Sequence, residues 1–180
     1  MTYQKSFLHL LAVTMVFSLG ALFSACGSDD DKNEIDNGKG SASDIIGTWG
    51  LVLKEYKIPN EQGGTNQSTT VYDYLNPSKG DELVISLAST DRGESYFTMR
   101  QYFYDYSGEI WKIASKDEAF MNGMVLALTN SSTDQSYSCS INGNKLVMES
   151  KQAGTDYFIR YTFKKISTEV KNTDTLHIIP

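Results

Sequence analysis

Apolar and polar residues alternate over most of the chain from residue 48 to residue 166, in short segments separated by turn-forming residues. In the first segment, Trp49, Leu51 and Leu53 fall on one side, as in a strand with one buried face. The segments with this pattern are Thr48–Lys57, Thr70–Leu75, Glu82–Ala88, Glu94–Tyr106, Glu109–Ala114, Met124–Asn130, Gln135–Asn142, Lys145–Ser150 and Thr155–Ile166. Such spacing predicts an all-β fold, an antiparallel meander that closes into a barrel of about eight or nine strands.

Two places carry a more specific local signal. Asn142-Gly143 lies between two alternating segments and predicts a type I′ hairpin, in which both central residues have positive φ. Ser115 and Glu118 form a capping-box pattern ahead of Gly123, which predicts one short helix over Lys116–Asn122. A surface loop is the alternative for this segment.

The long segment Glu94–Tyr106 has two aromatic faces. Its apolar face holds Phe97, Met99 and Phe103, which we expect to point into the core. The opposite face holds four tyrosines, which we expect to be outward or to line a polar mouth: Tyr96, Tyr102, Tyr104 and Tyr106. Exposed tyrosines can stack on sugars or grip a peptide, so these four are the candidate ligand-binding residues. The alternative is that tyrosine is simply a favourable strand residue.

The first 25 residues read as a secretory leader. A single positive charge, Lys5, precedes the apolar run Phe7–Phe17, and small residues follow it. The uncharged stretch Ser6–Ser28 is also long enough to be a transmembrane anchor, which is the alternative. Residues 27–43 are almost entirely polar and predict a flexible tether.

Leu22-Phe23-Ser24-Ala25-Cys26 resembles a bacterial lipoprotein box. The resemblance implies cleavage before Cys26 and lipidation of that residue, which would anchor the protein in a membrane. Asp29-Asp30-Asp31 resembles the acidic surface-export signal of Bacteroidota-type lipoproteins and implies an outer-membrane protein exposed at the cell surface. The alternatives are the periplasmic face of that membrane, or a charge run that only keeps the tether solvated.

Gly47-Thr48-Trp49 at the start of the first strand resembles the opening of lipocalins and of the lipocalin-like domains of Bacteroidota lipoproteins. The resemblance covers residues 44–166 and implies a calycin-type barrel, with Trp49 plugging one end and Arg160 stacked across it. Residues 167–180 lack the helix that follows the last strand of full lipocalins, so we expect a tail or a short edge strand at Leu176–Ile179.

Charge and rare residues exclude several functions. After the leader, 22 acidic residues outnumber 15 basic ones, which disfavours nucleic acid and anionic lipid as partners. The two His and two Cys of the whole chain cannot form a zinc site or a catalytic triad, and we expect no metal, no cofactor and no enzymatic activity. The carboxylate pairs Asp81-Glu82 and Asp105 with Glu109 could cleave a glycosidic bond, but acidic residues at strand ends more often only confer solubility. Cys139 would be a small buried hydrophobe, or a thiol that pairs with another chain.

Two functions from different classes fit these observations. The first is a non-enzymatic, surface-anchored binding module whose ligand is a small apolar molecule or a glycan fragment at the barrel mouth. The second is a protein-interaction role, an inhibitor or accessory subunit with a packed, ligand-free barrel. The inward-facing residues discriminate between them, because large side chains throughout the interior would favour the second. The sequence identifies neither the ligand nor a protein partner.

Overall fold

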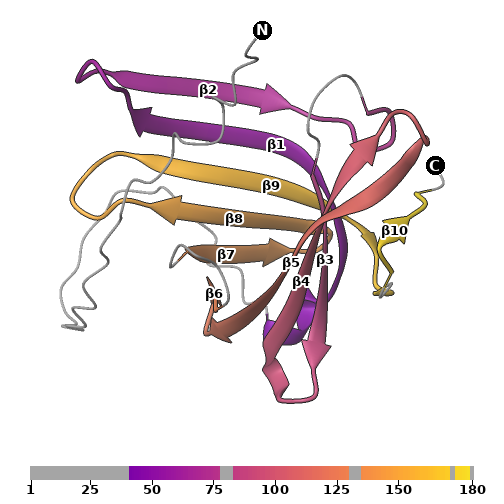
Figure 1. Ribbon diagram of the computed structural model, residues 1–180. Helices are drawn as coiled ribbons and strands as arrows, with labels where there is room; N and C mark the ends of the chain where they lie inside the picture. The colour runs from indigo at the N-terminus through magenta and orange to yellow at the C-terminus, as the bar shows by residue number, and fades with distance from the viewer. Residues whose placement is uncertain (1–40, 78–82, 130–134, 171–172, 179–180) are drawn as a thin grey trace, which may run out of the picture. The chain divides into compact units, whose positions relative to one another are not determined.

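A computed structural model describes residues 41–77, 83–129, 135–170 and 173–178 of the chain (Figure 1). The predicted leader, Cys26 and the acidic run at residues 29–31 lie outside the described residues, as do Asp81 and Glu82. The elements are the 3₁₀ turn η1 (Ala42–Ile45) and the strands β1 (Gly47–Pro59), β2 (Thr65–Val71), β3 (Val84–Thr90), β4 (Gly93–Asp105), β5 (Ile110–Asn122), β6 (Val125–Leu128), β7 (Ser136–Asn142), β8 (Lys145–Lys151), β9 (Phe158–Ser167) and β10 (Thr175–Leu176).

Eight of the strands form a closed ring. Each is antiparallel to its neighbours, in the order β1-β3-β4-β5-β6-β7-β8-β9, and pairing of β9 with β1 completes the circuit. Closure satisfies the backbone groups that an open sheet would leave at its edges. The prediction of an all-β antiparallel meander is therefore confirmed, and the ring is barrel-like.

Two strands lie off the ring. The first residues of β1 pair with β3, whereas Leu53–Pro59 pair with β2, so β1 and β2 form a hairpin arm (Figure 1). The arm lies beside β9, because Leu53–Lys57 also pair with that strand. Near the C-terminus, β10 pairs with the start of β5 through Thr175 and Leu176.

Three local predictions need correction. Residues 116–122 are neither helix nor surface loop: they are the second half of β5, paired with β4 on one side and β6 on the other. The capping pattern does not produce a helix because Lys116–Phe120 pair with β4 and Ala119–Asn122 pair with β6. In the β7–β8 hairpin, Asn142 pairs with Lys145 and only Gly143 of the two central residues has a positive φ, 57°. This is typical of a type II′ turn rather than a type I′ turn.

The third correction concerns Leu53, which was expected on the same side as Trp49 and Leu51. A register shift between Leu51 and Leu53 turns the Leu53 side chain off the inward face, so Leu53 is not part of either hydrophobic core described below.

The inner core fills the ring. It is formed by the inward-facing side chains of all eight ring strands, and η1 contributes Ile45. Trp49 is fully buried, as expected, and its Nε1 donates to the carbonyl oxygen of Ile45 at 2.8 Å. The η1 turn is thereby fixed to the first strand at one end of the ring.

A second core lies on the outer face of β3, β4 and β5. Its buried members are Tyr74, Val84, Tyr102, Trp111 and Leu176. The Tyr74 ring packs so closely on Gly50 that a Cβ atom there would lie 2.4 Å from it. The C-terminal segment covers this face, because the Tyr102 hydroxyl donates to the Thr173 carbonyl at 2.9 Å and the Ile113 amide donates to that of Asp174. The middle of β4, from Phe97 to Tyr102, therefore has buried side chains on both faces.

Candidate functional site

The inward face of the ring changes from apolar to polar side chains along the strands. Alternation along β9 places Tyr161 on the same face as Phe163, a buried member of the inner core, and register places Lys54 opposite Tyr161. On β4 and β5 the same face passes from Met99 to polar side chains. The polar and aromatic residues at the edge of the inner core on this face are here called the mouth cluster: Lys54, Tyr72, Gln101, Ser115, Asp117, Tyr137 and Tyr161. Tyr137 is itself a buried member of the inner core, and Tyr72 and Tyr161 pack against it.

Aromatic rings make up one side of the mouth cluster. The ring of Tyr161 lies 6.2 Å from that of Phe163 in a stacked arrangement and 6.3 Å from the ring of Tyr137, edge-on. Lys54 Nζ lies 5.6 Å from the centroid of the Tyr161 ring, within the range of a cation–π contact. The tyrosines therefore rest on the inner core while a cation covers one of them.

Polar side chains of β4 and β5 make up the other side. The Ser115 hydroxyl donates to Asp117 Oδ2 at 2.9 Å, and Gln101 Nε2 donates to the same oxygen at 3.4 Å. All three side chains are partly buried. They hold the Asp117 carboxylate on the inward face, close enough to Tyr137 to affect its ionisation.

Tyr137 and Tyr161 stay protonated at neutral pH. Burial, followed by the nearby Tyr161, Asp117 and Cys139, raises the pKa of Tyr137 far above its ordinary value. Burial and the neighbouring Tyr72 also raise the pKa of Tyr161. Within the described part of the chain, neither hydroxyl has a hydrogen-bond partner, so each can donate to or accept from a bound molecule.

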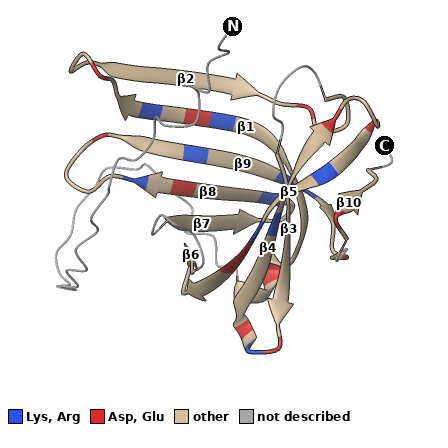
Figure 2. Cartoon of the chain, viewed as in Figure 1, with Lys and Arg blue, Asp and Glu red and all other residues tan. Residues whose placement is uncertain are grey.

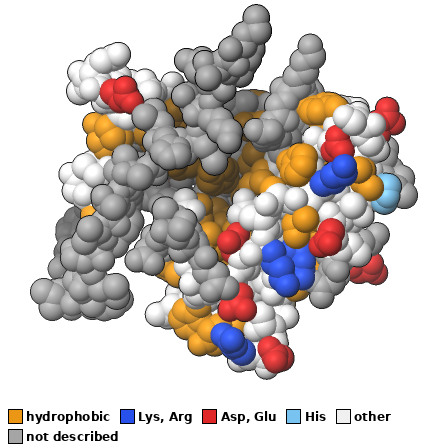
Figure 3. All heavy atoms as spheres, in the orientation of Figure 1, with side chains coloured by type: hydrophobic (Ala, Val, Ile, Leu, Met, Phe, Trp, Pro, Cys, Tyr) orange, Lys and Arg blue, Asp and Glu red, His pale blue; other side chains and the backbone are white. Residues whose placement is uncertain are grey.

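The exposure of the mouth cluster agrees with an accessible mouth. Figure 3 shows hydrophobic side chains near the centre of the view. All members of the mouth cluster except the buried Tyr137 are partly exposed. The arrangement offers flat rings, free hydroxyls, one ammonium group and one carboxylate to a molecule entering the ring.

The four tyrosines predicted as ligand-binding residues do not share one exposed face. Tyr102 is 0 % exposed in the outer core, so the expectation that it is outward and accessible is wrong. Tyr104 packs edge-on against Trp111 at 5.3 Å, and Tyr96 packs against Phe120 at 4.9 Å. Tyr106, 47 % exposed, is the most accessible of the four. Alternation along β4 correctly placed these tyrosines on the face opposite Phe97 and Met99, but the C-terminal segment covers part of that outer face.

Two other expectations fail for geometric reasons. Phe103 is 37 % exposed rather than buried, because it lies on the inward face beyond the end of the packed core. Arg160 does not stack on Trp49: the residue paired with Trp49 is Lys165, whose Nζ lies 4.6 Å from the indole ring and donates to the Asp44 carbonyl.

Arg160 instead lies on the outer face of β9, between acidic residues of β1 and β8. Its nitrogens lie 2.5 Å from Glu149 Oε2 and 3.3 Å from Glu55 Oε2. Figure 2 shows charges of both signs side by side on these three strands. Burial acts to raise the pKa of Glu149, but hydrogen bonds from Lys151 and Arg160 outweigh it and lower that pKa.

Cys139 is buried in the inner core, which confirms its expected packing role. Burial raises the pKa of its thiol to about 12, so the reactive thiolate is scarce at neutral pH.

Sequence reasoning did not identify Tyr137 and Tyr161 as site residues. The signal was available in their alternation with core positions, Tyr137 with Cys139 and Ile141, and Tyr161 with Phe163. Alternation within each segment does not show that β7 and β9 contribute side chains to the same mouth of the ring.

The described ranges contain no cluster of three or more potential metal ligands. Among those same residues, no helix is both long and apolar enough to cross a bilayer. Comparison with known proteins found no matching family model, no similar curated protein and no matching solved structure.

Proposed function

We propose that this chain is a non-enzymatic binding module that holds a glycan fragment in the mouth of its strand ring. The single observation that carries the proposal is the mouth cluster, in which the free hydroxyls of Tyr137 and Tyr161 lie above a packed core. The filled end of the ring supplies a rigid support, and the open end supplies the contacts.

The chemistry of the mouth favours a sugar over a purely apolar ligand. An apolar molecule would remove water from Lys54 and Asp117 without replacing their hydrogen bonds, which is unfavourable. A pyranose ring has apolar faces that stack on tyrosine and hydroxyls that pair with charged and polar groups. A glycan fragment thus satisfies both sides of the cluster.

The same mouth gives little support to hydrolysis. Glycoside hydrolysis usually needs two carboxyl groups across the bond to be cleaved, and the mouth cluster contributes one, Asp117. At the far turn, a hydrogen bond from Lys112 lowers the pKa of Asp105, with Nζ and Oδ2 2.5 Å apart. Asp105 is therefore a charged partner of Lys112 rather than a general acid.

We further propose that the module is anchored by lipid at Cys26 and displayed on the outer surface of the outer membrane. The support is the lipoprotein box and the acidic run that follows it. A lipid anchor on a polar tether would leave the mouth free to meet glycans outside the cell.

Metabolic labelling with a palmitate analogue tests the anchor. The wild-type chain should take up the label, and Cys26→Ala should lose it, because no acyl acceptor thiol remains at the cleavage site. Cys139→Ala is the matched control and should keep the label. Labelling that persists in Cys26→Ala would contradict the anchor.

The protein-interaction role remains a second candidate because of the β1–β2 arm. Nearly every residue of β2 is exposed, and Val71 at its end is 79 % exposed. An exposed strand of this kind can accept a further strand from a partner. Loss of partner capture on removal of the arm, with no glycan bound, would favour this role.

A glycan array and calorimetry test the proposed site. The double variant Tyr137→Phe, Tyr161→Phe removes two hydroxyls and keeps both rings, so folding should persist while glycan affinity falls about tenfold or more. Tyr104→Phe on the outer face is the matched control and should bind as the wild type does. If no glycan binds the wild type, or if the double variant binds unchanged, the proposal fails.

A further inference from the structure

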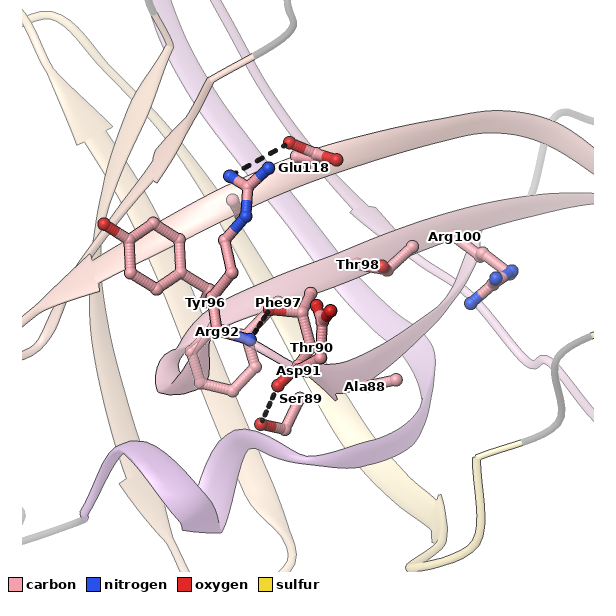
Figure 4. A pocket seen from close by; sticks show the side chains of 11 residues that line it. Ala88, Ser89, Thr90, Asp91, Arg92, Tyr96, Phe97, Thr98, Arg100 and Glu118 are labelled. Carbon is pink, nitrogen blue, oxygen red and sulfur yellow. Dashed lines mark hydrogen bonds and ion pairs between the residues drawn. The ribbon is translucent and has the colours of Figure 1, made fainter.

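A second hollow lies on the outer face of the ring, around the turn between β3 and β4 (Figure 4). Its volume is about 320 Å³, enough for a small ligand of single-ring size. Its walls include outward side chains of β3, β4 and β5, residues of the β3–β4 turn, and Phe97 and Ala119 of the inner core. The lining residues that could contact a ligand through charged, hydroxyl or aromatic groups include Arg92, Tyr96, Thr98, Arg100 and Glu118.

Arg100 is the unusual member of this pocket. It is 7 % exposed, and its Nη1 is fully buried without any hydrogen-bond partner. Among the described residues it forms no ion pair, although Asp174 lies near enough to influence its neighbour Tyr102. A buried guanidinium group without an acceptor is energetically costly, so an unsatisfied donor marks a position where an acceptor is expected.

The residue directly opposite Arg100 makes the charge imbalance larger. Register pairs Arg100 with Lys116 on β5, and like charges directly across a ladder repel each other. No described carboxylate forms an ion pair with Lys116. This part of the outer face therefore carries two cations, neither of which forms an ion pair with a described carboxylate.

The other charges of the pocket do not compensate. Arg92 pairs with Glu118, with Nη1 and Oε2 3.9 Å apart, so that carboxylate is already engaged (Figure 4). Asp91 is exposed on the turn. Thr98, beside Arg100 on the same face, has no hydroxyl partner among the described residues, and the Tyr96 ring forms an apolar wall under the Arg92 side chain.

We propose that this pocket is a second ligand site, separate from the mouth of the ring, for a small organic anion. Its carboxylate or phosphate group accepts hydrogen bonds from Arg100 and Thr98 and is attracted by Lys116. Its apolar part extends along Thr98 toward Tyr96. Arginine suits this role because its guanidinium group donates two parallel hydrogen bonds to either anion.

Calorimetry on the full-length protein in detergent tests the site with three probes that share one aromatic ring. Phenyl phosphate and benzoate carry the two candidate anions, and benzyl alcohol is the neutral control. We expect at least one anion to bind and the alcohol not to bind, and the stronger of the two anions identifies the preferred group. Absence of binding by both anions would overturn the proposal.

Two variants connect that binding to Arg100. Arg100→Met keeps the buried stem and removes the charge, so anion affinity should fall about tenfold or more while the melting temperature stays equal or rises. Arg160→Met removes an arginine that already has two acidic partners, and it should leave anion binding unchanged. Unchanged binding in Arg100→Met would overturn the site, and so would a lowered melting temperature, which would show that Arg100 has a structural partner.

A third variant separates this site from the mouth. The double change Tyr137→Phe, Tyr161→Phe should leave binding of the anionic probe unchanged, because those residues face inward. A parallel loss there would place the anion in the mouth and overturn the outer site. Failure of the outer site would not affect the glycan proposal, which rests on different residues and different probes.

Discussion

The two cores of this protein are built from the same strands but closed in different ways. The inner core is enclosed by a ring of paired strands, so every side of it is bounded by backbone hydrogen bonds. The outer core is one face of β3, β4 and β5 covered by a short C-terminal segment that includes the two-residue strand β10. Closure by a ring depends on many contacts, whereas closure by a segment depends on a few. We therefore expect the inner core to determine stability and the outer core to open more easily.

The largest effect should come from the inner core. Trp49→Ala removes a fully buried indole and its hydrogen bond to Ile45, and should lower the free energy of unfolding by about 3–5 kcal/mol. Denaturant unfolding measures this loss. Phe103→Ala is the control on the same inward face but at the open end, and it should cost less than about 1 kcal/mol. Similar losses for both variants would mean that the two ends of the ring are equally packed.

A smaller effect should come from the outer core. Tyr102→Phe removes only the hydroxyl that donates to Thr173, and should lower the free energy of unfolding by about 1 kcal/mol. Hydrogen exchange should show faster exchange of the Ile113 amide, which donates to Asp174 in the same segment, while the amides of β8 keep their rates. If β8 amides accelerate equally, the outer core opens only with the whole fold, and the contrast between the two cores is wrong.

The outer core also explains why the predicted binding surface was misplaced. Alternation along β4 correctly separates Phe97 and Met99 from Tyr96 and Tyr102. It cannot show that a segment more than 70 residues later covers Tyr102, because the cover comes from the end of the chain. From the sequence alone, an apolar or aromatic residue on the face opposite the core is predicted to be exposed, unless the distant segment that covers it is known.

Two arginines show that the sequence also does not identify the partners of charged groups, because those partners come from distant strands. The sequence offers Arg160 as a partner for Trp49 by resemblance, but strand register places Lys165 there and leaves Arg160 between two glutamates. Arg100 looks ordinary in the sequence. Only its position on the outer face of β4, opposite Lys116 and beside the pocket, makes it a buried cation without a partner among the described residues.

The sequence by itself determined the local pattern: which segments are strands, where most turns fall, and that Trp49 and Cys139 are buried. These properties follow from alternation and turn residues, which act over a few positions. Tertiary structure alone decided that residues 116–122 extend a strand, that the mouth collects Tyr137 with Tyr161, and that Tyr102 is covered. Each of these depends on pairing between segments far apart in the chain, and a β-ring is made almost entirely of such pairings.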